Sequence, residues 1–381
     1  MYIKPFAVEE WMNEYEVGAR FNIAETCVDS VSPDQLFALT GVDKQAFLAD
    51  LCAKRLTYGD IVGSDALREG ICKLYKTVQP HQVVPTHGAA GANHHVFCSL
   101  ISAGDRVVSI MPTYQQLYSI PESIGAEVAI MHLKQENDYL PDLSELKALV
   151  TPDTKMICIN NPNNPSGVVY NKETLIRLQK MLEKAEERIG HPIYVLSDEP
   201  YRELVYDGCE LPFAPDYIKN CIVVYSFSKS LSLSGERIGY MAVSRQIAEY
   251  DTMINALVVA NRCIGYINAP SLFQLVVADC LDVKTDVEFY DRNRKLLYES
   301  MKDMGFECVK PEGAFYMLVK APTGDDAEFS AAAKKFNLLI VPATSFGCPG
   351  YVRMAYCVSN EMIHRALPAL QKLADHYGLK K

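Results

Sequence analysis

The chain has 381 residues, with 47 acidic and 37 basic side chains, a formal net charge of −10 and a pI near 5.4. This length suffices for two domains or one large α/β unit, and the acidic balance argues against nucleic acid and anionic membranes as partners. The twelve cysteines include no Cys-x-x-Cys pair, which argues against a zinc site or a disulfide scaffold and favours a reducing cytoplasm. No signal-peptide core opens the sequence, and no apolar stretch approaches the length of a membrane span. We therefore predict a cytoplasmic protein with no metal ion.

Short apolar runs alternate with longer helical patterns over most of the chain. The clearest helical patterns cover 172–188 and 288–304. The apolar runs that we expect to be strands lie at 83–84, 107–110, 128–131, 156–159, 193–196 and 222–225. This alternation predicts a mostly parallel sheet with helices on both faces. Beyond about residue 280, strands are predicted near 314–320 and 351–358, with a final helix from Asn360.

Small residues follow the first predicted strand. The segment Gly88-Ala89-Ala90-Gly91-Ala92 can open a helix whose backbone N–H groups and dipole receive a phosphate; the alternative is an ordinary helix start. The G-x-G-x-x-G spacing of a dinucleotide site is absent. After the next predicted strand, Met111-Pro112-Thr113-Tyr114 adds an aromatic ring, which taken alone indicates only a core or surface tyrosine.

Polar clusters follow the last three predicted strands of this series. They are Asn161-Pro162-Asn163-Asn164-Pro165-Ser166-Gly167, Ser197-Asp198-Glu199-Pro200-Tyr201 and Ser226-Phe227-Ser228-Lys229-Ser230. Each alone is consistent with a tight loop. Ligands of open α/β sheets bind outside the carboxyl ends of the strands, so three such clusters together favour one shared site.

Lys229 is the most informative residue of these clusters. It is flanked by hydroxyls, and Arg237 follows eight residues later. An aldehyde cofactor with a phosphate tail needs such a set, because the amine can form a Schiff base while hydroxyls and a guanidinium hold the phosphate. The alternative is a solvated lysine in a strand-to-helix loop.

The three clusters, in this order and with the continuation to Leu231-Ser232-Leu233-Ser234-Gly235-Glu236-Arg237-Ile238-Gly239-Tyr240, resemble the fold-type I pyridoxal-phosphate enzymes. The resemblance is to the class I/II aminotransferases and runs from about Tyr58 to Arg353. It implies an α/β fold with a large pyridoxal-phosphate (PLP) domain at 50–280, built on a mostly parallel seven-stranded type of sheet between helices. A smaller α+β domain is implied at 1–49 and 281–381.

The resemblance also implies roles for individual residues. Lys229 carries PLP as a Schiff base and then moves the proton between the substrate α-carbon and the C4′ carbon of PLP. Asp198 keeps the ring nitrogen protonated, while Asn164 and Tyr201 contact the ring's phenolate oxygen. Arg353 grips the substrate α-carboxylate through its planar fork, beside Asn164. The remaining implied cofactor contacts are Ala89, Ala90, Ser226, Ser228 and Arg237 at the phosphate, and Tyr114 on the ring face.

Tyr58 matches a tyrosine that reaches a neighbouring subunit's phosphate, which implies a homodimer. The implied reaction is ping-pong transfer of an amino group from an L-amino acid to a 2-keto acid. One segment departs from the family, because Ile23 to Ser30 replaces a G-x-P-x-F-like loop that closes over substrate. The reaction therefore stays open to a β-lyase, to a capreomycidine-synthase-like cyclase or oxidase, and to a non-catalytic relative. Acidic Glu25 and Asp29 in this segment predict a basic or polar substrate side chain, unless both are solvated.

Overall fold

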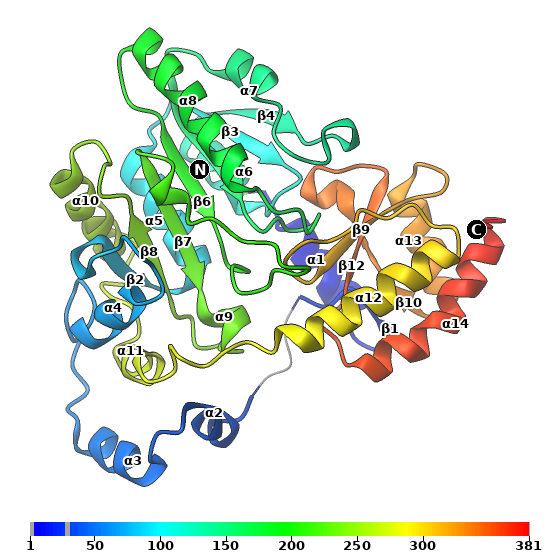
Figure 1. The fold of residues 1–381 in the computed structure, drawn as a ribbon, viewed down its shortest axis with the longest axis horizontal. Helices are drawn as coiled ribbons and strands as arrows, with labels where there is room; N and C mark the ends of the chain where they lie inside the picture. The colour runs from blue at the N-terminus through cyan, green and yellow to red at the C-terminus, as the bar shows by residue number, and fades with distance from the viewer. Residues whose placement is uncertain (1–3, 27–30, 381) are drawn as a thin grey trace.

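The computed structural model describes residues 4–26 and 31–380, and it contains two main sheets (Figure 1). The larger sheet has seven strands in the order β2-β8-β7-β6-β5-β3-β4. Its strands are β2 (Val83–Thr86), β3 (Arg106–Met111), β4 (Glu127–His132), β5 (Thr154–Asn160), β6 (Tyr194–Asp198), β7 (Cys221–Ser226) and β8 (Gly239–Val243). Strands β3 to β7 pair in parallel, whereas β8 pairs antiparallel with both β7 and β2. The predicted mostly parallel sheet is confirmed, and β8 is a strand that the apolar runs did not indicate.

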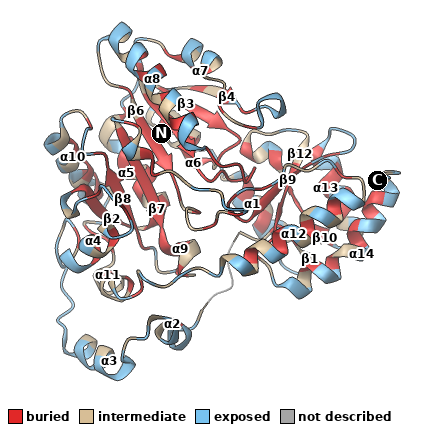
Figure 2. Cartoon of the chain, viewed as in Figure 1, coloured by how far each residue is buried: buried red, intermediate tan, exposed pale blue. Residues whose placement is uncertain are grey.

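Alternate residues of each strand enter cores on opposite faces of this sheet, as the pleat requires. Along β5, Ile157 and Ile159 join one hydrophobic cluster, whereas Met156 and Cys158 join the other. The helices along these faces and at this end of the molecule are α4 (Asp65–Cys72), α5 (Gly88–Leu100), α6 (Gln116–Ile124), α7 (Leu143–Leu149), α8 (Lys172–Ile189), α10 (Tyr250–Cys263) and α11 (Ser271–Ala278). Figure 2 shows the strands buried between partly exposed helices.

Helix α8 shows how the local sequence defines an element. The side chain of Asn171 accepts a hydrogen bond from the Thr174 amide and caps the start of the helix. Leu175, Leu178 and Leu182 recur at helical spacing and are buried, so one face packs on the sheet. Gly190 ends the helix with a φ of +84°, a conformation that glycine adopts without steric cost.

The smaller sheet is antiparallel, in the order β11-β12-β9. It consists of β9 (Tyr316–Lys320), β11 (Val341–Pro342) and β12 (Tyr351–Ala355), and it lies beside α12 (Val287–Asp303), α13 (Asp326–Lys335) and α14 (Asn360–His376). Near the N-terminus, β1 (Phe21–Asn22) pairs in parallel with β10 (Leu338–Leu339). The N-terminal segment thus joins the C-terminal part of the chain, while the exact domain limits at 49/50 and 280/281 stay predictions.

Helices α2 (Pro33–Thr40) and α3 (Lys44–Ala53) lie beyond the edges of both sheets (Figure 1), and α2 joins the larger hydrophobic core through its buried Leu36. Their ends are well formed, because Ser32 and Gln35 make a capping box and Asp43 caps α3. Helix α3 nevertheless buries none of its residues within this chain. No helix in the described part of the chain is both long and apolar enough to cross a membrane.

Candidate active site

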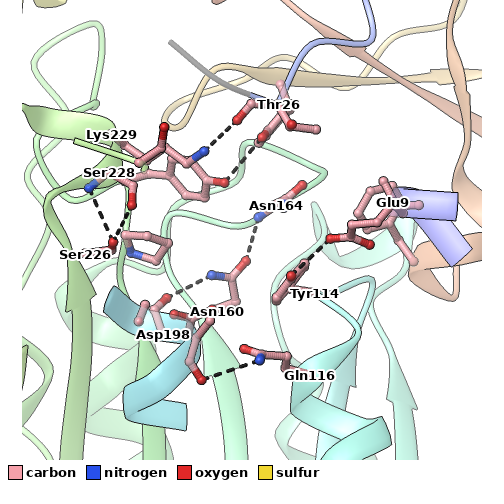
Figure 3. Close-up of a pocket in the computed structure, with 18 of the residues that line it drawn as sticks. Glu9, Thr26, Tyr114, Gln116, Asn160, Asn164, Asp198, Ser226, Ser228 and Lys229 are labelled. Carbon is pink, nitrogen blue, oxygen red and sulfur yellow. Dashed lines mark hydrogen bonds between the residues drawn. The ribbon is translucent and has the colours of Figure 1, made fainter. Parts of the chain in front are cut away.

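A cavity of about 370 Å³ opens at the carboxyl ends of β5, β6 and β7 (Figure 3). Most of the residues predicted for the site line it together: Ala89, Ala90, Tyr114, Asn164, Asp198, Tyr201, Ser226, Ser228, Lys229, Arg237 and Arg353. Tyr58 does not line this cavity, and its side chain is 69% exposed. Among residues 4–26 and 31–380, no group of three or more His, Cys, Asp or Glu side chains is placed to hold a metal ion.

The start of α5 forms one end of the cavity. Gly88 has a φ of +70°, and a Cβ atom there would lie 3.1 Å from Arg237 Nη2 and 3.3 Å from Ser226 Oγ. The hydroxyl oxygens of Ser226 and Ser228 are 2.8 Å apart and hydrogen-bonded. A helix N-terminus, two hydroxyls and a guanidinium therefore converge where the chain leaves no room for a side chain. This donor set fits a phosphate group.

Asp198 ends β6 at the floor of the cavity. Its side chain is 3% exposed, and its Oδ1 has no hydrogen-bond partner among the described residues. Burial, with the neighbouring Glu199 carboxylate, raises the pKa of Asp198 to about 7. A buried carboxylate in this state fits a cationic partner such as a protonated pyridine nitrogen, which would favour the ionised form.

Glu199 follows Asp198 but forms its contacts elsewhere. Its carboxylate accepts hydrogen bonds from Ser197 Oγ at 2.7 Å and from Arg202 Nη1 at 3.2 Å. Arg202 Nη1 also donates to the hydroxyl of Tyr75 at 3.1 Å. Burial still raises the pKa of Glu199 to about 7. These contacts position the end of β6, and of the two neighbouring acids only Asp198 lines the cavity.

The middle of the cavity is built from β5 and the loop after it. Asn160 Nδ2 donates to the backbone oxygen of Asp198 at 2.8 Å, and Asn160 Oδ1 accepts from the Asn164 amide at 2.6 Å (Figure 3). The hydroxyls of Tyr201 and Tyr316 lie 3.3 Å apart. Asn160 and Tyr316 were not predicted; Asn160 directly precedes the first polar cluster, which is a signal that the sequence offered.

Lys229 lies in the short helix α9 (Phe227–Ser230), directly after β7. Its Nζ donates to the backbone oxygen of Thr26 at 2.5 Å (Figure 3) and lies 5.6 Å from the centroid of the Phe315 ring. The amine is therefore held inside the cavity, between the sheet end and the N-terminal segment.

Arg353, on β12, is 1% exposed. Its guanidinium donates to Asn164 Oδ1 and to the backbone oxygen of Ala24, each at 3.3 Å, and it lies 4.2 Å from the Tyr316 ring centroid. Nε has no hydrogen-bond partner, and no carboxylate of the described residues comes within 4.0 Å. Because a buried cation needs an anionic partner, this site fits a ligand carboxylate.

The N-terminal helix α1 (Ala7–Tyr15) forms part of the cavity wall beside the loop after β3 and was not predicted. The Tyr114 hydroxyl donates to Glu9 Oε1 at 3.0 Å (Figure 3). The next residue, Gln115, fixes the start of the helix through bonds with Pro5 O at 2.7 Å and with the Ala7 amide at 3.0 Å. Lining residues that sequence reasoning missed are Val8, Glu9, Met12, Asn13, Glu16, Thr26, Asn93, Gln116, Asn160, Pro200, Ser234, Tyr316 and Phe346.

The two acids singled out near the N-terminus differ in outcome. Asp29 lies outside the described residues. Glu25 does not line the cavity itself; its carboxylate accepts from the Thr26 amide at 2.8 Å and from Asn22 Nδ2 at 3.4 Å. Through Asn22 it approaches Glu16, which does line the cavity.

Comparison with known proteins gives the class of protein. Residues 34–370 match the family described as aminotransferase class I and II. The chain is 32% identical over 324 residues to an aspartate aminotransferase of Thermotoga maritima, covering 82% of each chain. It is 30% identical over 358 residues to a probable aspartate/prephenate aminotransferase of Aquifex aeolicus, covering 87% of this chain and 88% of the relative.

Two solved structures are similar over their whole lengths. An aminotransferase from Eubacterium rectale superposes with a TM-score of 0.87 at 34% identity, covering 99% of this chain and 96% of that one. A PLP-dependent aminotransferase from Streptococcus suis gives 0.83 at 32% identity, covering 100% of both chains. The chain belongs to the class I and II aminotransferase family. It is a PLP-dependent aminotransferase of fold type I, which confirms the leading prediction for fold, cofactor and reaction.

Proposed function

We propose that the cavity at the ends of β5, β6 and β7 is where this aminotransferase binds PLP, and that Lys229 is the residue that carries it. The observation that carries the proposal is the unpartnered, buried carboxylate oxygen of Asp198 in the same cavity as Lys229. When bound, PLP supplies an electron-withdrawing ring that allows the α-proton of an amino acid to be removed.

The surrounding residues divide this work between binding and proton transfer. Ser226, Ser228, Arg237 and the α5 N-terminus hold the phosphate end, with the Ala89 and Ala90 backbone at the first turn of that helix. At the other end Asp198 would pair with the protonated ring nitrogen, and Tyr114 would cover one face of the ring. Asn164 and Tyr201 would donate hydrogen bonds to the ring's phenolate oxygen.

Substrate binding and proton transfer involve two basic residues. Arg353 binds the substrate α-carboxylate and thereby orients the α-carbon toward Lys229. With PLP bound, the Lys229 amine would move the proton from the substrate α-carbon to the cofactor. The Thr26 carbonyl, 2.5 Å from Nζ, restricts where that amine can lie. The cofactor would keep the amino group while the donor leaves as a keto acid, whose new carbonyl oxygen comes from water, and a second keto acid would then receive the amino group.

A homodimer is part of the same proposal, as is a reducing cytoplasmic setting. The backbone oxygen of Tyr58 accepts a hydrogen bond from Asn268 Nδ2, whereas its side chain is exposed. The Tyr58 ring can therefore reach the cofactor site of a second subunit. Nearby Leu56 is 82% exposed and α3 buries nothing within the chain, as expected of surfaces covered by a two-fold partner. The cysteines of the described residues are all free, which suits a reducing compartment.

Borohydride reduction of the holoenzyme tests the central assignment. Reduction converts the Schiff base into a stable amine, so peptide mapping should find the pyridoxyl group on Lys229. A label on any other lysine would refute the assignment. A protein that shows no visible cofactor band after incubation with PLP would refute the proposed site as a whole. Light scattering of the same preparation should give the mass of a dimer, and a fully active monomer would contradict the proposed assembly.

A further inference from the structure

Polar residues of α1 form part of the cavity wall, next to Tyr114. Glu9, Asn13 and Glu16 are spaced at i, i+4 and i+7, which places them along one side of the helical path. Val8 and Met12 are buried and anchor the helix in a small cluster with Phe346. The polar side chains are therefore held at the cavity by packing.

Only some of the charged residues that line the cavity have a role in the proposed function. In the described part of the chain, the charged residues of the lining are Lys229, Arg237, Arg353, Asp198, Glu9 and Glu16. The proposed function employs the three cations and Asp198 for the cofactor and the substrate α-carboxylate. The two carboxylates on the α1 side are left over, and neither has a Lys, Arg or His partner within 4.0 Å among the described residues.

Glu16 lies in a markedly anionic environment. Asn22 Nδ2 donates to Glu16 Oε1 at 3.5 Å and to Glu25 Oε2 at 3.4 Å, so a single amide bridges the two carboxylates. Burial and the Glu25 charge raise the pKa of Glu16. A nearby cation would relieve the repulsion between these carboxylates and favour the ionised form of Glu16.

Buried unpartnered groups in the same cavity show that a charged ligand belongs there. Arg353 is 1% exposed with an unpartnered Nε, and Asp198 Oδ1 is also without a partner. Ala24, next to Glu25, accepts a hydrogen bond from Arg353. The acidic N-terminal segment thus runs beside the arginine that would hold the α-carboxylate.

A second carboxylate on the substrate is poorly matched to this wall. The relatives named aspartate aminotransferase act on a donor whose side chain is a carboxylate. A buried carboxylate needs a cation of its own. Within the lining contributed by the described residues, Lys229, Arg237 and Arg353 are already employed. An aspartate side chain directed toward α1 would meet Glu9 and Glu16 instead, and like charges repel.

We propose that α1 selects the amino donor, and that the donor carries a cationic side chain of the ornithine, lysine or arginine type. This inference rests on the proposed function, because it takes Arg353 as the α-carboxylate site. Glu16, supported by Glu25 through Asn22, and Glu9 form the acidic surface that the side-chain cation approaches. Asn13 adds a neutral amide on the same face.

Matched donors give the direct test with the holoenzyme. Ornithine and norvaline share the same carbon chain and differ by the δ-ammonium group, so their kcat/KM ratio measures recognition of the charge. We expect ornithine to exceed both norvaline and aspartate by roughly tenfold or more, the worth of about 1.4 kcal/mol. Aspartate or norvaline reacting as well as the best of ornithine, lysine and arginine would overturn the inference.

Variants of α1 locate the effect. Glu16→Gln should lower kcat/KM for ornithine about two- to fivefold more than that for norvaline, in line with partly exposed ion pairs. Glu10→Gln is the matched control, because Glu10 is an acid on the same helix that does not line the cavity. Equal losses for both donors, or the same loss in Glu10→Gln, would show that α1 does not recognise the charge.

A binding measurement separates this inference from the proposed function. Calorimetric titration of the borohydride-reduced enzyme, which cannot turn over, should show tighter binding of ornithine than of norvaline, and the difference should shrink in Glu16→Gln. If the label maps to Lys229 but ornithine has no advantage, the inference fails and the proposed function stands. If the label maps elsewhere, the proposed function fails first.

Discussion

Asp198→Asn should have opposite effects on the apoenzyme and the holoenzyme. Burial raises the pKa of Asp198 from an ordinary 3.8 to about 7. Ionisation of this buried acid therefore lowers the stability of the folded apoenzyme. A pKa difference is worth about 1.36 kcal/mol per unit, so the loss of stability at high pH, relative to low pH, is roughly 4 kcal/mol. Asparagine keeps the shape and removes the charge.

The sign of the pH dependence follows from linkage. A carboxyl with a raised folded-state pKa contributes stability that is fully present below pH 3.8 and is lost as the pH rises through about 7. The advantage of Asp198→Asn over wild type in apoenzyme stability should therefore grow by about 2–3 kcal/mol between pH 5 and pH 8. Urea unfolding of both apoenzymes at one protein concentration measures it, with exposed Asp282→Asn as the control.

The holoenzyme of the same variant should be severely impaired. Asparagine cannot supply the negative charge that holds the ring nitrogen protonated, so the Lys229 linkage should still form while turnover falls by orders of magnitude. The reasoning is refuted if the stability advantage of the Asp198→Asn apoenzyme over wild type does not grow from pH 5 to pH 8, or if the Asp198→Asn holoenzyme retains activity close to that of wild type. A stable apoenzyme with a coloured but inactive holoenzyme is the expected combination.

Three further substitutions address the other parts of the site. Lys229→Ala should abolish turnover yet still bind PLP without a covalent link, which absorbance after gel filtration would show; loss of all PLP binding would contradict the separate phosphate and ring contacts. Arg353→Lys should raise the KM for amino donors about ten- to a hundredfold, because one charge-assisted hydrogen bond is worth about 1.5–3 kcal/mol, and an unchanged KM would remove Arg353 from the carboxylate site. Tyr58→Phe should weaken PLP binding by no more than about 1.5–3 kcal/mol, which the extent of apoenzyme formation during dialysis would measure. Unchanged retention of PLP would contradict a phosphate contact from the partner subunit.

The sequence predicted the parts of the site that follow directly from strand ends. Asn164, Asp198 and Lys229 each come directly or shortly after an apolar run, and parallel strands bring their carboxyl ends to one edge of a sheet. Strand order does not need to be known for this inference. The position of the polar clusters at the strand ends was therefore enough to predict one shared cavity. The family resemblance added the role of each residue.

The parts that were missed depend on contacts between distant segments. Strand β8 lies within the motif around Arg237, and it is defined by antiparallel pairing with β2 and β7, a property that no local pattern contains. Helix α1 is held by Val8 and Met12 packing near Phe346, more than 330 positions along the chain. Local periodicity over nine residues is too weak a signal to predict such an element.

The proposed cofactor and substrate sides of the cavity are built from different elements, which explains why the cofactor side was easier to predict than the substrate. Most of the residues proposed to bind the cofactor lie at or just after the ends of strands in the seven-stranded sheet, so their positions are fixed by the same hydrogen bonds that fix the fold. The proposed substrate side faces α1 and the segment after it. This segment contains β1, Phe21 and Asn22, which pairs with β10 in a separate two-stranded sheet. That N-terminal segment contacts both Arg353, through Ala24, and Lys229, through Thr26. Changes in its sequence can therefore alter which side chain is accepted without disturbing the groups that we propose to hold PLP.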